Sequence, residues 1–326
     1  MINVVIVMAN ECASSSVTSA VDIFTFANQI HQSQSGTNAT HFKTVTVSWT
    51  GEQVAGLGGL ILSPQAKAEA IEHADIILFP GFMQQIFSEL PNLVSYHNWI
   101  KYHYQRGAYI CSMCTGSFIL AESGILDDKL ATTHWHYARH FSKAYPQIKL
   151  NEKLILTEDQ RVICAGGATA ANDLILLLVE KFVSKELAYE CSKILLINTA
   201  RRSQSEYILT HFYRNHSDTS IGKVQDWLED HFSENFSIEQ VAQNFGFGER
   251  QFKRRFKRAT SETPISYIQK LRVEFTKKQL ALTNQNFETI TFDAGYSDAN
   301  SYRRLFKTTT GLTPSTYRKK FDQCSA

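Results

Sequence analysis

One cysteine occupies a position at which a chain could use it for chemistry. Cys114 follows the apolar run 109–113 and precedes a helical pattern, with Gly116 two positions on. A nucleophile in a tight strand-to-helix turn has this layout, and a helix N-terminus would lower the pKa of the Cys114 thiol. The alternative is a small cysteine packed under a turn, which is common in protein cores.

Neighbouring cysteines and histidines allow two further kinds of site. Cys111 and Cys114 have the spacing of a redox pair, but Cys111 belongs to the expected strand and Cys114 to the turn, so geometry decides whether they meet. His136 and His140 share a helical face, yet no cysteine or carboxylate pattern completes a metal site with them. We therefore expect no metal and no cofactor, and the redox pair remains an alternative.

The segments around Cys114 indicate a mainly parallel sheet. Apolar runs alternate with helical patterns at 21–30 and 93–105, and a polar turn is expected at 14–19. The apolar runs lie at 3–8, 42–49, 74–79 and 109–111. Such alternation predicts an α/β domain with a doubly wound sheet covered on both faces, and ligands bind such sheets at the carboxyl ends of the strands.

Length and charge favour more than one domain and an acidic partner. The 326 residues have room for two or three domains. Residues 221–326 hold 17 Lys and Arg against 12 Asp and Glu, whereas the other 220 residues hold 16 against 19. A basic block on an otherwise acidic chain indicates a polyanion.

The apolar and cysteine content predicts a cytoplasmic protein. The first residues lack a basic leader, and no apolar run approaches the roughly 20 residues of a membrane span. Six cysteines in no framework spacing fit a reducing compartment. We expect no membrane partner.

A motif of about 30 residues occurs twice near the C-terminus. One copy spans 237–267 and the other 286–317, with glycine turns at Gly246 and Gly295. Both copies continue with a Phe-Lys pair and a Thr-Pro pair; the copies are offset by 49 residues at the glycine and by 50 residues after it, so one residue has been gained between the helices. Repetition at this period predicts two copies of a helix, a tight turn and a second helix, within an all-α domain.

Aromatic positions decide which side chains of each second helix face outward. Phe252 and Phe256 lie one turn apart and must point inward together, as do Tyr302 and Phe306. The remaining faces are basic or polar, and a helix-turn-helix places such a face in the DNA major groove, where Arg reads guanine and Asn reads adenine. The alternative is a solvated charged surface. The predicted DNA contacts are Arg250, Lys253, Arg254, Lys257, Asn300, Ser301, Arg303, Arg304 and Lys307.

Capping residues and a polar stretch set the expected boundaries. Ser237 with Gln240 forms a capping box, and the Thr-Pro pairs start supporting helices, of which the first continues over 265–282. The polar, aperiodic stretch 200–220 is interpreted as a linker. The expected domains are therefore 1–199 and 221–326.

The second domain resembles the AraC/XylS-type DNA-binding domain. The similarity covers about 221–321 and is most specific from Gly295-Tyr296-Ser297-Asp298 to Gly311-Leu312-Thr313-Pro314. The resemblance implies two recognition helices that enter successive major-groove segments on one face of double-stranded DNA.

The first domain resembles the PfpI/ThiJ-type, glutamine-amidotransferase-like domain, in the version found in GlxA-type transcription regulators. The similar segments are 79–81, 114–118, 121–127, 131–135 and 166–174. The resemblance implies a flavodoxin-like fold with Cys114 at its elbow. The chain departs from the family's enzymes at three places: Ser16 stands where their acid belongs, Ser19-Ala20 replaces the usual Gly-Pro, and Thr115 stands where a histidine often follows the cysteine.

These departures favour ligand binding over turnover, because general acid–base catalysis lacks a carboxylate or an imidazole. We therefore expect a regulator, not an enzyme, that senses a small nitrogenous metabolite and works as a homodimer. A Cys114-dependent hydratase or amidohydrolase and a cysteine redox sensor are the alternatives. The expected ligand-binding residues are Ser16, Gly81, Cys114, Thr115, His134, Gly167 and Ala168.

Overall fold

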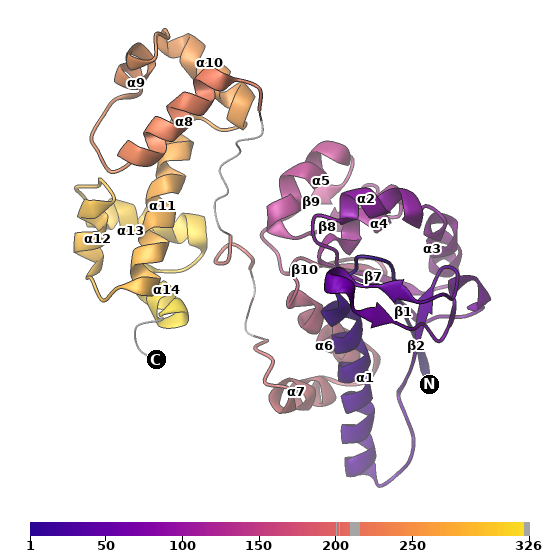
Figure 1. Cartoon of the computed structure of the whole chain (residues 1–326). Coiled ribbons are helices and arrows are strands. Elements are labelled where there is room, and N and C mark those ends of the chain that lie inside the picture. The colour runs from indigo at the N-terminus through magenta and orange to yellow at the C-terminus, as the bar shows by residue number, and fades with distance from the viewer. Residues whose placement is uncertain (200, 202, 209–215, 323–326) are drawn as a thin grey trace. The chain divides into compact units, whose positions relative to one another are not determined.

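The chain forms two compact units (Figure 1). The computed structural model describes residues 1–199, 201, 203–208 and 216–322, and it divides into Met1–Gln204, the first unit, and Ser205–Ala326, the second unit. The expected linker 200–220 lies partly outside the described residues, as do the last four residues of the expected second domain.

A seven-stranded sheet organises the first unit. Its order is β10-β11-β7-β6-β1-β2-β5, and every neighbouring pair is parallel except β10 with β11. This confirms the expected mainly parallel sheet. The strands are β1 (Ile2–Val7), β2 (Phe42–Ser48), β5 (Ala66–Lys67), β6 (Ile76–Phe79), β7 (Tyr109–Met113), β10 (Leu156–Asp159) and β11 (Val162–Ala165). Two small sheets pair β3 (Val54–Ala55) with β4 (Ile61–Leu62) and β8 (Leu130–Ala131) with β9 (Lys149–Leu150).

Helices cover both faces of this sheet, as the doubly wound pattern predicts. On one face lie α1 (Ser14–Ser35), α6 (Ala170–Phe182) and α7 (Lys185–Ile194). The other face carries α2 (Ile86–Glu89), α3 (Tyr96–Gln105), α4 (Ser117–Glu122) and α5 (Ala138–Ala144). Because both faces are covered, residues 4–7 of β1 and the whole of β6 are buried.

The polar turn expected at 14–19 is wrong, because these residues form the first turns of α1. Val17 and Ala20 are buried on the same face as Phe24, which extends the helical spacing toward the N-terminus. The Ser16 hydroxyl donates to the carbonyl of Ala13 over 2.6 Å, so this serine is accommodated inside a helix by bonding to its own backbone.

The second unit is all α-helix, as expected. Its helices are α8 (Thr219–His231), α9 (Ile238–Asn244), α10 (Glu249–Thr260), α11 (Pro264–Leu282), α12 (Phe287–Asp293), α13 (Ala299–Thr310) and α14 (Pro314–Phe321). The capping box of Ser237 with Gln240 is confirmed, as are the N-cap threonines Thr263 and Thr313. Asn286 caps α12 and Asp298 caps α13.

Two separate cores lie inside the second unit. The first surrounds Phe252 and Phe256 of α10, and the second surrounds Tyr302 and Phe306 of α13. Helix α11 contributes to both, through Tyr267 and its neighbours on one side and Leu280 on the other. Among the described residues, none of the helices is both long enough and apolar enough to cross a lipid bilayer.

Candidate functional site

Cys114 lies at a sharp elbow between β7 and α4. Its φ of +55° falls in the left-handed region, which non-glycine residues adopt at an energetic cost. Glycines make room on both sides: a Cβ on Gly81 would lie 3.0 Å from Cβ of Cys114, and one on Gly116 would lie 2.5 Å from the carbonyl oxygen of Pro80. The strand-to-helix geometry predicted for a nucleophile is therefore present.

The thiol of Cys114 is not activated, contrary to the expected effect of the helix N-terminus. Its side chain is almost completely buried, and burial raises the pKa of Cys114 to about 11. Hydrogen bonds with Thr115 lower this pKa by less than burial raises it. The following helix α4 has only six residues, so its dipole is small beside the cost of desolvating a thiolate.

Ser16 and Gly81 connect the loops that follow β1 and β6, next to Cys114. The Gly81 N–H donates to Oγ of Ser16 over 3.2 Å, and the Ala13 N–H donates to the Gly81 carbonyl over 2.7 Å. Thr115 makes an equivalent connection, because its Oγ1 donates to the Phe82 carbonyl over 2.5 Å and accepts from the Phe82 N–H over 2.8 Å. The hydroxyls of Ser16 and Thr115 thus form hydrogen bonds with backbone groups of neighbouring loops. They stand at the positions where the family's enzymes have an acid and, often, a histidine.

His134 follows a threonine that contacts the elbow directly. Thr133 Oγ1 donates to the Cys114 carbonyl over 3.4 Å and accepts from Ser117 Oγ over 2.8 Å. His134 itself is half-buried, and its Nδ1 accepts from the His136 N–H. Burial first, and the charge of His136 second, lower the pKa of His134 to about 4. The imidazole is neutral at pH 7.

Gly167 and Ala168 lie at the same end of the sheet as Cys114, as the pairing register of their strands shows. Strand β11 pairs with β7 so that Ala165 lies opposite Met113, and the chain after each strand leaves the sheet at the same end. Gly167 is half-buried and Ala168 is exposed. The expected ligand residues thus share one end of the sheet, with Ser16, Gly81, Cys114 and Thr115 in one buried group and Ala168 at the surface.

The pattern of residues gave no reason to single out Gln204, which lies at this edge. Its Nε2 lies within hydrogen-bonding distance of four acceptors: Thr133 O (3.0 Å), Thr132 Oγ1 (3.2 Å), Glu152 O (3.0 Å) and Leu154 O (2.9 Å). Its side-chain oxygen accepts from the Trp135 N–H over 3.3 Å. A Cβ on Gly166 would lie 2.0 Å from this amide nitrogen, so only glycine leaves room for it.

Arg201, three residues before Gln204, contacts the start of α6. The Arg201 guanidinium donates to Oγ1 and O of Thr169 and pairs with the carboxylate of Asp173. Burial raises the pKa of Asp173, and Arg201 opposes that rise. The described residues between 201 and 204 are therefore held on the first unit at two points.

In the described part of the chain, the cysteines form no disulfide and no metal-binding cluster is present. Cys111 and Cys114 are both free thiols, and burial raises the pKa of Cys111 well above its ordinary value. His140 packs against the rings of Phe87 and Phe118. Among residues that the structure describes, no group of three or more His, Cys, Asp or Glu side chains could hold a metal ion.

In the second unit, α10 presents a basic outer face. Arg250, Lys253, Arg254 and Lys257 are all exposed, while Phe252 and Phe256 are buried beneath them. A surface depression of about 530 Å³ at the start of α10 is lined by residues 248–251 and Arg254. Lys253 pairs with Glu249 one turn earlier, so one of the four cations is partly neutralised.

Arg255 of the same helix has a different role. It donates from Nε and a terminal nitrogen to the carboxylate of Asp218, over 2.5 and 2.8 Å, and lies over the ring of Phe247. This bond lowers the pKa of Asp218, which also caps α8 through the Ile221 N–H. Arg255 therefore joins the start of α8 to the basic helix.

The outer face of α13 is polar, and one of its arginines is paired with residues of the same unit. Asn300, Ser301, Arg304 and Lys307 are exposed. Arg303 is half-buried: it donates to Oδ1 of Asn300 over 2.7 Å and to Glu288 over 3.1 Å, and its guanidinium lies 5.1 Å from the ring centre of Phe287.

Comparison with known families agrees with both halves of this description. Residues 3–181 match the model of the DJ-1/PfpI family, and residues 241–320 match a model described as a helix-turn-helix domain. The first match covers more than half of the chain and includes Ser16, Gly81, Cys114, Thr115 and His134. The second includes α10 and α13.

Relatives with both halves are named as regulators. The chain is 24% identical over 298 residues to the HTH-type transcriptional regulator CdhR of Pseudomonas aeruginosa, covering 91% of this chain and 85% of that protein. It is 23% identical over 307 residues to the HTH-type transcriptional regulator GbdR of the same species, covering 93% and 80%.

Solved structures share the fold of the first unit. An AraC family transcriptional regulator from Pseudomonas putida matches 60% of this chain and 100% of its own, with a TM-score of 0.52 and 23% identity. A transcriptional regulator protein from Vibrio parahaemolyticus, described as putative in its title, matches 60% and 98%, with a TM-score of 0.53 and 22% identity. The chain belongs to the DJ-1/PfpI family and, with its C-terminal helix-turn-helix unit, is a transcription regulator.

Proposed function

We propose that a small metabolite binds at the sheet edge around Cys114 and that its binding changes how the second unit engages DNA. The observation that best supports this proposal is the position of Gln204. This last residue of the first unit bonds to the backbone at Thr133 and Trp135, on either side of His134. A ligand that moves His134 would therefore also move the chain at the point where it leaves the sensing unit.

Three features of the edge support binding over turnover. The Cys114 thiol is protonated at neutral pH, and Ser16 offers a hydroxyl that already donates to Ala13. The imidazole of His134 is neutral, so it cannot stabilise a thiolate as a cation would. The nitrogenous character of the effector follows from the family resemblance alone.

The proposed DNA contacts are the exposed side chains of α10 and α13. Arg250, Lys253, Arg254 and Lys257 supply the denser positive charge, which favours phosphate and guanine. The face of α13 carries less positive charge, and its Asn300 is suited to adenine. Its exposed side chains are Asn300, Ser301, Arg304 and Lys307. Arg303 is included with a smaller expected share, because Glu288 and Asn300 already hold it.

A homodimer is the proposed working form in the cytoplasm. Tyr189, Ile194 and Leu196 on and after α7 are large apolar side chains with 60% or more of their surface exposed. Large exposed apolar side chains are a common feature of protein interfaces. Light scattering of the full chain and of Tyr189→Asp tests this; a monomeric native chain would exclude it.

The coupling through Gln204 can be tested with two variants of the full chain. A thermal-shift screen of metabolites first finds a compound that stabilises the native chain, since binding to the native state raises the melting temperature. That compound is then added to Gln204→Ala and to Gln243→Ala, whose amide is on an exposed residue of α9.

We expect the compound still to stabilise Gln204→Ala but no longer to change its affinity for duplex DNA. The Gln243→Ala control should keep both responses. A Gln204→Ala chain whose DNA affinity responds like the native chain would contradict the proposed coupling. Loss of stabilisation in Cys114→Ala, but not in an exposed-surface variant such as Asn38→Ala, would support the site itself.

A further inference from the structure

One arginine lies between the two cores of the second unit. Helix α11 is the segment they share: Leu271 belongs to the core around α10, and Val273 belongs to the core around α13. Arg272 lies between them and is half-buried. Its side chain is therefore placed where one helix-turn-helix half ends and the other begins.

The guanidinium of Arg272 donates to three backbone carbonyls from both halves. Nε donates to Phe232 O over 2.7 Å and one terminal nitrogen to Glu234 O over 3.0 Å, both in the connection between α8 and α9. The other terminal nitrogen donates to Gly295 O over 3.1 Å, in the turn of the second motif. The planar fork of arginine suits three such acceptors, which a lysine ammonium cannot reach in the same geometry.

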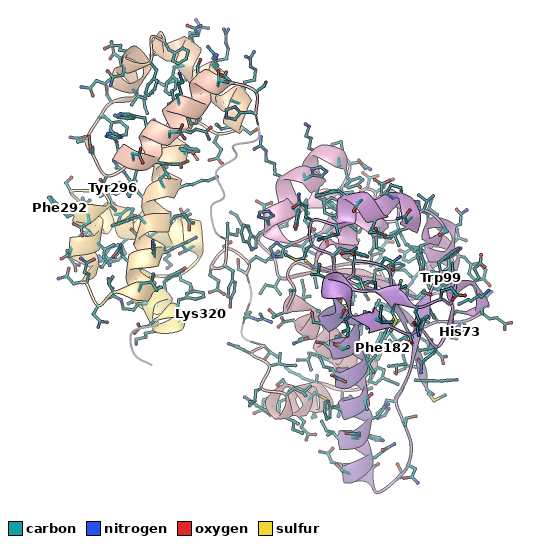
Figure 2. The ribbon with its side chains drawn as sticks, viewed as in Figure 1. His73, Trp99, Phe182, Phe292, Tyr296 and Lys320 are labelled. Carbon is teal, nitrogen blue, oxygen red and sulfur yellow. The ribbon has the colours of Figure 1, made fainter. Side chains whose placement is uncertain are left out.

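Other close contacts around Arg272 involve the same two segments, the α8–α9 connection and the turn of the second motif. The Arg272 guanidinium lies 4.9 Å from the ring centre of Tyr296, one of the residues labelled in Figure 2. Gly295 has a φ of +81°, and a Cβ there would lie 2.3 Å from the carbonyl oxygen of Ser233. The rings of Phe232 and Phe275, from the two halves, lie 5.4 Å apart.

We propose that Arg272 is a positioning residue that fixes the orientation of α10 relative to α13, and thereby the spacing of the two DNA segments that the protein accepts. This inference rests on the proposed DNA contacts of these two helices. Successive turns of the groove on one face lie about 34 Å apart, so two rigidly joined helices match one spacing only. Helices joined only by α11 would tolerate several spacings.

Spin labels test the rigidity without any DNA. The labels go on Gln251→Cys in α10 and Thr309→Cys in α13, which are exposed and outside the proposed contacts. The cysteines at 12, 111, 114, 164 and 191 are buried, and Cys324, outside the described residues, is replaced by serine. Dipolar spectroscopy on the full chain then gives the distribution of distances between the two labels.

We expect a single narrow distribution in the parent chain and in Lys278→Ala, an exposed position on the same helix. In Arg272→Ala the distribution should broaden or shift, and Arg272→Lys, which keeps the charge but not the fork, should lie nearer to alanine. A distribution in both Arg272 variants as narrow as that of the parent would overturn the proposal. If alanine does not fold, the lysine variant decides.

Selection of binding sites from random duplex DNA tests the functional part. The parent chain should enrich two short sequences at one fixed gap, and Arg272→Lys should enrich the same sequences with gaps that vary by one or more base pairs. The same single gap in the variant would overturn the proposal. Failure of the parent to enrich any sequence would instead count against the proposed DNA contacts, while the label distances would still decide the role of Arg272.

Discussion

The backbone N–H of Gly81 donates to Oγ of Ser16 over 3.2 Å, immediately beside Cys114. Both residues are buried, and the serine hydroxyl donates its own hydrogen bond to the carbonyl of Ala13. Ser16 thus satisfies a buried backbone donor at the position where an enzyme of this family would carry its acid. At this position the chain has a side chain that bonds to the backbone of two loops.

Replacing Ser16 with alanine should lower the free energy of unfolding by about 1–3 kcal/mol, because the Gly81 N–H would be left buried without an acceptor. Urea unfolding of the full chain measures this change. Ser33→Ala is the matched control, since Ser33 makes the same kind of bond to a carbonyl three residues earlier but is exposed. Equal losses in the two variants would show that the Gly81 bond contributes nothing.

The thiol of Cys114 should react slowly with alkylating reagents. With its pKa at about 11, only about one thiol in a thousand is ionised at pH 8, against roughly one in four for an ordinary cysteine. Iodoacetamide labelling, followed by mass spectrometry of the peptide that contains Cys114, should be on the order of 100-fold slower in the folded chain than in urea. A labelling rate that levels off near pH 7 would reveal an activated thiolate and revive the enzymatic alternative.

His134 should make the protein less stable in acid. Its folded pKa of about 4 lies below the ordinary value of 6.5, so the unfolded chain binds more protons between these pH values. The free energy of unfolding therefore falls as pH falls through that window. Melting temperatures from pH 7.5 to 5 should decrease more steeply for the native chain than for His134→Gln; parallel curves would exclude this contribution.

The arginines of the two recognition helices should differ in their effect on DNA binding. Arg254→Ala and Arg304→Ala should each weaken specific binding by roughly 1–3 kcal/mol. Arg303→Ala should cost less binding and more stability, because Arg303 already bonds Glu288 and Asn300. Binding isotherms on selected and random duplexes measure this. Equal loss on both duplexes would identify Arg254 and Arg304 as phosphate contacts.

Periodicity and repetition predicted most of the architecture from the sequence. The Thr-Pro pairs at 263 and 313 placed two helix starts to the residue, because a threonine cap followed by proline leaves the backbone little choice. The serine-rich start of α1 was missed, since serine propensity favours turns and only burial of Val17 and Ala20 makes it helical.

Contacts between residues that are far apart in the sequence could not be predicted from the sequence pattern. Gln204 bonds to residues 50 to 72 positions earlier, and nothing in its polar neighbourhood indicates a buried amide. Nothing in the sequence around Arg255 indicates that Asp218, 37 residues away, accepts its hydrogen bonds. The pKa of Cys114 was misjudged for the same reason, because desolvation depends on the loop around Gly81 and not on the local helix.

The place of Gln204 in the chain has a consequence for synthesis. Every acceptor of its amide lies in the range from Thr132 to Leu154. All residues that bond to Gln204 have therefore been synthesised before residue 204 leaves the ribosomal exit tunnel. N-terminal domains generally fold first as a chain emerges. The first unit can therefore complete its fold, including the bonds of Gln204, before the first residue of α10 is available to bind DNA.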